Sequence, residues 1–227
     1  MSDIATNLQA VRERVAAAAR AAGRDPAEIS LLAVSKTWPA ARVREAALAG
    51  QRAFGENYVQ EAVEKIDALA SLDLEWHFIG PLQANKTRPV AERCAWVHSI
   101  DRLRVAERLS AQRPASLLAL QACVQVNVSG EASKSGCAPE EAEVLCRRVA
   151  ALPGLRLRGL MAIPEPSDDG VRQRAQFAVL RGLFATLRER GLELDTLSMG
   201  MSQDLEAAVA EGATLVRIGT AIFGQRN

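Results

Sequence analysis

The residue best suited to covalent chemistry is Lys36, which closes the short apolar run at residues 31–35. It is one of only four lysines, and arginine supplies the other 24 of the 28 basic residues. Unlike an arginine, a lysine with a deprotonated amine can form an imine, and desolvation at a strand end promotes that deprotonation. Lys36 is therefore a candidate Schiff-base residue for an aldehyde such as pyridoxal phosphate or a sugar. The alternative is a strand-ending lysine that extends its amine into water.

Two loops near the C-terminus carry groups suited to binding a phosphate. In residues 198–204, Gly200 permits a close backbone approach and Ser202 is expected to cap the next helix. In residues 217–224, Gly219 and Thr220 lie where a short helix would begin, which predicts backbone N–H groups and a hydroxyl converging on an anion. Ordinary turn glycines and an N-cap serine are the alternative for either loop alone.

The elements that position these residues alternate regularly. A helix is predicted over residues 4–22, and eight apolar runs follow, each trailed by a helical pattern. Alternating strands and helices predict a parallel sheet, and eight units predict a single α/β domain over residues 1–227: a (β/α)8 TIM barrel with an extra N-terminal helix. The competing fold is an open doubly wound sheet, but no GxGxxG follows the first strand. The expected strands are residues 31–35, 52–54, 75–79, 95–98, 119–126, 155–161, 196–199 and 214–218, and the expected helices 40–49, 57–70, 82–91, 101–112, 139–151, 170–190, 203–211 and 220–223.

Such a barrel places active sites at the C-terminal ends of its strands, often with a phosphate site after strands 7 and 8. Strand 8 neighbours strand 1 in a closed barrel, so Lys36 and both glycine loops are expected to lie close together.

Composition excludes several other classes of protein. The net charge of +1 favours neither nucleic acid nor an anionic membrane surface, and no apolar stretch approaches the roughly 20 residues of a membrane span. The N-terminus lacks the pattern of a secretion signal, which predicts a cytoplasmic protein. The four cysteines form no CxxC and have no histidine at ligand spacing, so reduced thiols are expected and no metal site.

Longer motifs along nearly the whole chain resemble the YggS/PROSC-type pyridoxal phosphate homeostasis proteins. VSK, GEN, GMS and RIGTAIFG are together highly specific for that family. The matching stretches are LLAVSKTWPA at 31–40, FGENYVQE at 54–61, WHFIGPLQANK at 76–86, HSIDR at 98–102, NVSGEASKSG at 127–136, LRLRGLMAIP at 155–164, LSMGMSQDLEAA at 197–208 and VRIGTAIFG at 216–224.

The resemblance implies a fold-type III barrel like the cofactor-binding half of alanine racemase, with pyridoxal 5'-phosphate (PLP) as cofactor. Lys36 would carry the internal aldimine, Arg217 would face the pyridine nitrogen, and Asn57 would lie on the other side of the ring. The phosphate would be held by residues of both glycine loops, namely Ser198, Met199, Gly200, Ser202, Gly219 and Thr220.

Three functions are compatible with these residues. The first is a protein of PLP homeostasis that holds and delivers the cofactor without turnover, with apo PLP-dependent enzymes as recipients. The second is a racemase-like enzyme acting on amino acids. Two-base racemisation needs a second acid–base group, and the only tyrosine, Tyr58, is as compatible with packing at a helix start. The third is a class I aldolase-like barrel. The absence of a second domain favours a monomer.

The remaining polar residues have more ordinary interpretations. His77 is expected to be a hydrogen-bonded histidine of the barrel interior, whereas His98, at the end of strand 4, is equally compatible with reaching the site. Lys65 is expected to pair with Glu61 on a solvated helix face, since the two are four residues apart. Exposure is expected for the loop lysines Lys86 and Lys134, with a secondary role at the cofactor as a minor alternative for Lys134.

Overall fold

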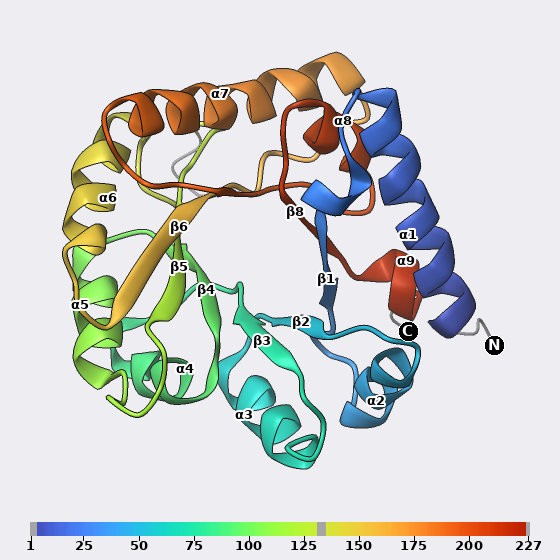
Figure 1. The fold of residues 1–227 in the computed structure, drawn as a ribbon, viewed down its shortest axis with the longest axis horizontal. Coiled ribbons are helices and arrows are strands. Elements are labelled where there is room, and N and C mark those ends of the chain that lie inside the picture. The colour runs from blue at the N-terminus through green and yellow to red at the C-terminus, as the bar shows by residue number, and fades with distance from the viewer. Residues whose placement is uncertain (1–3, 131–134, 226–227) are drawn as a thin grey trace.

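Eight parallel strands close into a barrel in the computed structural model, which describes residues 4–130 and 135–225 (Figure 1). Each strand pairs with the next along the chain, and β8 pairs with β1 to close the ring. The predicted (β/α)8 fold is therefore confirmed. The strands are β1 (Ser30–Val34), β2 (Ala53–Glu56), β3 (Glu75–Phe78), β4 (Trp96–Ile100), β5 (Leu120–Gln125), β6 (Leu155–Met161), β7 (Thr196–Ser198) and β8 (Leu215–Ile218).

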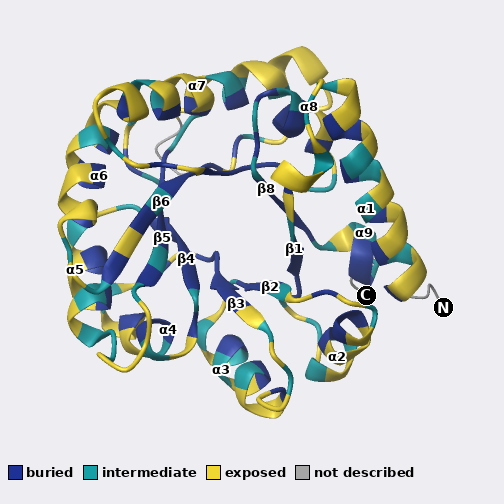
Figure 2. Ribbon diagram, viewed as in Figure 1, coloured by how far each residue is buried: buried dark blue, intermediate teal, exposed yellow. Residues whose placement is uncertain are grey.

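Helices surround this barrel (Figure 1). Their apolar faces pack against the outward-facing strand residues. The strands are therefore largely buried (dark blue), whereas the outer faces of the helices are exposed (yellow, Figure 2). The helices are α1 (Ile4–Ala21), α2 (Ala40–Leu48), α3 (Val59–Ala68), α4 (Thr87–Arg93), α5 (Leu103–Gln112), α6 (Ala142–Ala150), α7 (Gly170–Glu189), α8 (Leu205–Ala210) and α9 (Thr220–Phe223), with short 3-10 turns at Pro26–Glu28, Ala84–Lys86 and Pro139–Glu141.

The extra N-terminal helix is present, and it packs where the barrel closes. One face of α1 is buried, with apolar residues at Ile4, Leu8, Val11 and Val15. This face lies against α8 and α9, the last two helices of the chain. Asn7 extends the contact by donating a hydrogen bond to the carbonyl of Ile222 at 3.0 Å. The first and last described helices therefore stabilise the same side of the barrel.

Several predicted helix boundaries shift for identifiable reasons. The helix predicted from residue 57 begins at Val59, because Tyr58 is extended at its N-cap. The prediction that Ser202 caps a helix is wrong. The helix begins at Leu205, and the Asp204 carboxylate accepts a hydrogen bond from the Met201 N–H at 2.5 Å, which orders the preceding turn instead.

Other expectations about the chain can be compared with the structure directly. All four cysteines are buried free thiols, as predicted. Across residues 4–130 and 135–225, no three metal-ligating side chains gather at one point. No helix within those residues is both long and apolar enough to span a membrane.

Candidate functional site

A pocket of about 380 Å³ lies at the C-terminal ends of the strands, within the range of about 300–1,000 Å³ typical of small-molecule sites. It is formed at the ends of β1, β2, β3, β6, β7 and β8. Its lining includes Lys36, Asn57, Ser202, Arg217, Gly219 and Thr220 from the predicted set, together with Val34, Ile79, Ile163, Pro164, Pro166, Ser167, Gln173, Met201, Gln203 and Asp204.

Lys36 reaches this pocket because of the alternation along β1. Leu32 and Val34 belong to the small apolar cluster inside the barrel, so the residue two positions further along points the same way. Lys36 lines the pocket just beyond Val34 and is only partly exposed. The chain turns sharply immediately afterwards, where Thr37 adopts a φ of 68°.

Arg217 forms the positively charged floor of the pocket. It lies on β8, is 3% exposed, and donates hydrogen bonds to Ser198 Oγ at 2.8 Å and to the carbonyl of Ala162 at 2.9 Å. Burial lowers the pKa of Arg217 to about 10, against the opposing effect of the nearby Asp204 carboxylate. A guanidinium with that pKa remains protonated at neutral pH, and its two bonds fix its plane.

Asn57 presents an unsatisfied polar atom beside the pocket. Its Oδ1 is buried and accepts no hydrogen bond from the described protein, although buried amide oxygens are normally paired. Gly80 lets the backbone of Asn57 come close, since a Cβ at Gly80 would lie 2.1 Å from the Asn57 carbonyl oxygen. The ends of β2 and β3 therefore place Asn57 with an acceptor available for a ligand.

The two glycine loops contribute differently from one another. Gly219 and Thr220 line the pocket directly, and so does Ser202. Ser198, Met199 and Gly200 are buried and lie outside the lining, with Ser198 bonded to Arg217. The carbonyl of Gly200 accepts the backbone N–H of Arg217 at 2.9 Å. These three residues therefore support the pocket from below, and their predicted contact with a phosphate stays a prediction.

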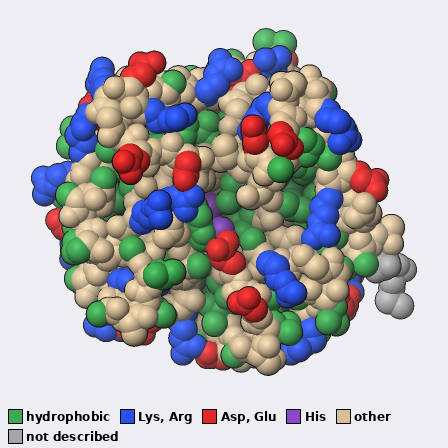
Figure 3. Space-filling view, viewed as in Figure 1, with side chains coloured by type: hydrophobic (Ala, Val, Ile, Leu, Met, Phe, Trp, Pro, Cys, Tyr) green, Lys and Arg blue, Asp and Glu red, His purple; other side chains and the backbone are tan. Residues whose placement is uncertain are grey.

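A file of hydrogen-bonded side chains runs through the barrel interior to Arg217. His77 Nε2 lies 2.8 Å from Glu75, His77 Nδ1 lies 2.9 Å from His98 Nε2, and His98 Nδ1 lies 2.7 Å from Ser198 Oγ. Burial lowers the pKa of His77 and holds the pKa of His98 well below its usual value, so both rings are neutral. A histidine is visible in the central hollow of the face shown in Figure 3, with acidic and basic side chains around it.

This file settles the positions of both histidines. His77 is a hydrogen-bonded interior residue, as predicted. His98 does not line the pocket, because it lies between His77 and Ser198, behind Arg217. Sequence reasoning missed the file, since its members come from strands 21 and 100 residues apart and no local pattern joins them.

The remaining predicted residues lie away from the pocket or outside the described chain. Tyr58 is 59% exposed at the start of α3 and does not line the pocket. Lys86 is exposed as expected, and Lys134 lies outside the described residues. The prediction for Lys65 is wrong in one respect. It does pair with Glu61, but it is 4% exposed, because the ends of β1 and β2 cover it.

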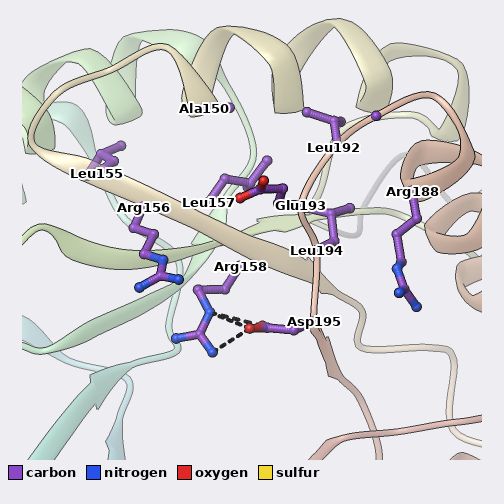
Figure 4. A pocket seen from close by; sticks show the side chains of 11 residues that line it. Ala150, Leu155, Arg156, Leu157, Arg158, Arg188, Leu192, Glu193, Leu194 and Asp195 are labelled. Atoms are coloured by element: carbon purple, nitrogen blue, oxygen red, sulfur yellow. Dashed lines mark hydrogen bonds and ion pairs between the residues drawn. The ribbon is translucent and has the colours of Figure 1, made fainter.

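A larger hollow, of about 800 Å³, lies at the opposite end of the strands (Figure 4). It is lined by residues 155–158 at the start of β6 and by residues 191–195 before β7. The Arg158 guanidinium is already paired there, with Asp195 at 2.6 Å and Gln121 at 2.8 Å. This end lacks Lys36, so the pocket at the C-terminal ends remains the candidate site.

Comparison with known proteins places this chain in a protein family. Residues 6–227 match the family described as Alanine racemase, N-terminal domain. The chain is 64% identical to the pyridoxal phosphate homeostasis protein of Pseudomonas aeruginosa, over 100% of this chain and 97% of that protein. It is 57% identical to the protein of the same name from Escherichia coli, over 100% and 98%. The chain belongs to the pyridoxal phosphate homeostasis protein family.

Solved structures agree with this placement. PipY of Synechococcus elongatus, determined with PLP bound, superposes with a TM-score of 0.85 at 39% identity, covering 97% of this chain and all of that one. The structure of PipY without PLP gives 0.87 at 40% identity, with the same coverage. Alanine racemase from Corynebacterium glutamicum gives 0.70 at 19% identity over 96% of this chain and 62% of the racemase, which shows the shared fold alone.

Proposed function

We propose that this protein binds PLP at the C-terminal mouth of its barrel and takes part in intracellular PLP homeostasis. The observation that carries the proposal is the convergence of Lys36, Asn57, Arg217 and the turn at Gly219 and Thr220 on one pocket. The relatives named above support it, since they are pyridoxal phosphate homeostasis proteins of nearly the same length, and PipY has been solved with PLP bound.

The pocket offers donors and acceptors suited to this cofactor. Lys36 offers an amine for covalent attachment, Arg217 a fixed cation, and Asn57 a buried amide oxygen without a partner. Ser202 and Thr220 offer hydroxyl groups toward a phosphate, beside the backbone of Gly219. When bound, PLP supplies an aldehyde that a lysine amine can capture and an electron-withdrawing pyridine ring.

Arg217 limits the chemistry that this site supports. Ser198 and Ala162 hold its guanidinium in place, and a permanent cation beside a pyridine nitrogen disfavours protonation of that nitrogen. An unprotonated pyridine withdraws electrons less strongly. Holding the cofactor depends on Lys36 and the phosphate contacts, whereas carbanion chemistry on an amino acid would also need that electron withdrawal.

We further propose that the protein holds and releases PLP without turning over a substrate, acting as a monomer in the cytoplasm and handing the cofactor to apo-enzymes. Tyr58, the lone tyrosine, lies outside the pocket lining. Among the described lining residues the carboxylate is Asp204, which already accepts the Met201 N–H and lies near Arg217. Neither side chain is arranged as the second base of a racemase.

The direct test is the visible absorption spectrum of the purified protein, before and after borohydride reduction. We expect a yellow protein whose reduced cofactor is recovered on the peptide containing Lys36, and a colourless Lys36→Ala variant. Lys86→Ala is the matched control, because Lys86 is exposed and lies outside the pocket. A wild-type protein that stays colourless and unmodified after incubation with PLP would refute the proposal.

A second measurement separates holding from catalysis. The loaded protein is incubated in deuterium oxide with a broad panel of amino acids, and exchange at Cα is followed by mass spectrometry. We expect no exchange above that caused by free PLP. Exchange that depends on Lys36 would establish the racemase-like alternative.

A further inference from the structure

Both residues that flank Lys36 are anchored to one turn of α3. Lys65 Nζ donates a hydrogen bond to the carbonyl of Ser35 at 2.7 Å. Glu61 Oε1 accepts the backbone N–H of Thr37 on the other side. Lys65 and Glu61 are four residues apart on the helix and form an ion pair at 2.7 Å. The turn that carries Lys36 is therefore held by a hydrogen bond on each side of that residue.

This anchor lies behind the barrel wall, away from the pocket. Leu32 and Val34 point inward, so Ser35 points outward toward α3. Ser35 Oγ donates to Glu56 Oε1 at 2.6 Å, and Lys65 Nζ donates to the same oxygen at 2.7 Å. Thus Lys65 joins the ends of β1 and β2 from outside the barrel.

The residue that follows each anchored strand end lines the pocket. Lys36 comes directly after Ser35, and Asn57 comes directly after Glu56. Lys65 itself does not line the pocket. A change at Lys65 would therefore reach a ligand only through the positions of Lys36 and Asn57.

Two features indicate that this arrangement serves more than general stability. Lys65 is 4% exposed and Glu56 is 1% exposed, and a buried ion pair often contributes less to stability than well-packed apolar side chains would. In addition, Thr37 is the one non-glycine residue with positive φ in the described chain, and such a backbone needs its surroundings to hold it. Glu61 supplies that hold through the Thr37 N–H.

We infer that Lys65 and Glu61 are positioning residues for Lys36, which they hold with its amine directed into the pocket. Lys65 fixes the peptide group before Lys36, and Glu61 fixes the one after it. The inference rests on the proposed function, because positioning the amine matters only if Lys36 captures an aldehyde.

The test compares two ligands that differ only at the reacting carbon. PLP carries an aldehyde, whereas pyridoxine 5'-phosphate carries an alcohol there and cannot react with an amine. The variants are Lys65→Met and Glu61→Ala, together with the conservative Glu61→Gln, whose amide oxygen can still accept the Thr37 N–H. Glu64→Ala is the matched control, since Glu64 is an exposed carboxylate on the same helix, bonded to Gln60.

In Lys65→Met and Glu61→Ala we expect covalent capture of PLP to slow at least about tenfold, since misplacing a reacting group by about 1 Å can slow a reaction about 100-fold. Affinity for pyridoxine 5'-phosphate should change less than about twofold. Glu61→Gln and Glu64→Ala should capture PLP like the wild type. Equal losses for both ligands, or unchanged capture in both disrupting variants, would overturn the inference.

A measurement without cofactor separates this inference from the proposed function. In the unliganded protein, hydrogen exchange of the Thr37 amide, followed by NMR, should be slow in the wild type and in Glu61→Gln. It should accelerate at least about tenfold in Glu61→Ala and Lys65→Met while the barrel amides stay protected. Fast exchange in the wild type would refute the anchor, whereas a failure of the wild type to capture PLP would refute the proposed function.

Discussion

The buried polar residues inside the barrel differ in charge, although their exposure is similar. Arg217 keeps its charge at the floor of the pocket, while His98 and His77 stay neutral between Ser198 and Glu75. The bond to His77 in turn lowers the pKa of Glu75. Arg217 therefore presents a fixed cation to the pocket, bonded to the neutral Ser198 hydroxyl and Ala162 carbonyl, with neutral histidines behind Ser198.

The neutral histidines make stability depend on pH. Their pKa values are lowered in the folded state, so below the unfolded pKa of about 6.5 only the unfolded chain takes up their protons, and stability falls as pH falls. For His98, whose pKa is held well below that value, we expect a loss of about 1.4 kcal/mol in the free energy of unfolding per pH unit below that point, until the pH reaches the folded-state pKa; the contribution of His77 has the same sign.

Urea denaturation at about pH 7.5 and about pH 5.5 measures this loss, and His98→Gln serves as the comparison. The variant should lose less stability between the two pH values, by about 1.4 kcal/mol, since glutamine does not titrate while the carboxylates are common to both proteins. An identical loss in the two proteins would show that His98 does not remain neutral in the folded state.

Residue types alone are enough to select Lys36 as a candidate but not to predict the buried position of Lys65. Lys36 could be singled out because it ends an apolar run in a chain with few lysines. Lys65 could not, because its spacing from Glu61 is the same whether the pair is solvated or buried, and burial comes from β1 and β2. The cofactor roles of all the residues predicted to bind it stay predictions, including those of Lys36 and Arg217.

At the scale of elements, the pocket depends on close contacts between neighbouring strand ends. The Ile79 N–H donates to the carbonyl of Glu56 at 2.9 Å, and Gly80 then passes against the backbone of Asn57. Any side chain at Gly80 would push the Asn57 carbonyl away. Gly80, just after β3, thus limits where Asn57, just after β2, can lie.

Replacing Gly80 tests this contact. In Gly80→Ala the new Cβ would meet the Asn57 carbonyl oxygen at 2.1 Å, so the β2 end must shift, at a cost of about 1–3 kcal/mol in the free energy of unfolding. Affinity for PLP should fall as Asn57 moves. Urea denaturation and a PLP titration measure both effects.

Gly182→Ala is the control for that experiment. Gly182 lies on α7, and no atom comes within 4 Å of the place that a Cβ would occupy there. Alanine should therefore stabilise the protein by about 0.4–1 kcal/mol and leave PLP affinity unchanged. If Gly80→Ala behaved like Gly182→Ala, the close approach would have no consequence for the site.

The sequence predicted the elements better than their ends. Periodicity located all eight strands, because a buried parallel strand reads as a short apolar run. The ends depend on contacts from elsewhere. Asp204, rather than Ser202, orders the turn before α8 by accepting a hydrogen bond from the Met201 N–H. No local sequence pattern marks Met201 as that donor.

At the scale of the whole molecule, α1 links the barrel closure to the pocket. Arg14 on this helix donates to the carbonyl of Ser202, a pocket residue, at 2.8 Å, and pairs with Glu206 on α8. On the buried face, Leu8 packs in the main core at 1% exposure. An element outside the (β/α)8 repeat therefore supports the loop after β7.

Truncating the buried face of α1 should destabilise the whole protein. We expect Leu8→Ala to lower the free energy of unfolding by about 2–5 kcal/mol, through lost burial and the cavity left behind. Leu48→Ala, at a 78% exposed leucine on α2, should stay within about 0.5 kcal/mol of the wild type. Urea denaturation of both variants gives the comparison, and equal effects would mean that α1 packs too loosely to matter.

The packing of α1 against α8 and α9 also has a consequence during synthesis. Asn7 and its partner Ile222 are 215 residues apart, so the ribosome, at about 5–20 residues per second, makes the first helix many seconds before its partner. Strands β1 and β8 are separated in the same way. A nascent chain can present Lys36 early but has no completed pocket around it. Completion of the pocket, and with it the proposed capture of the cofactor, therefore waits for the synthesis of β8.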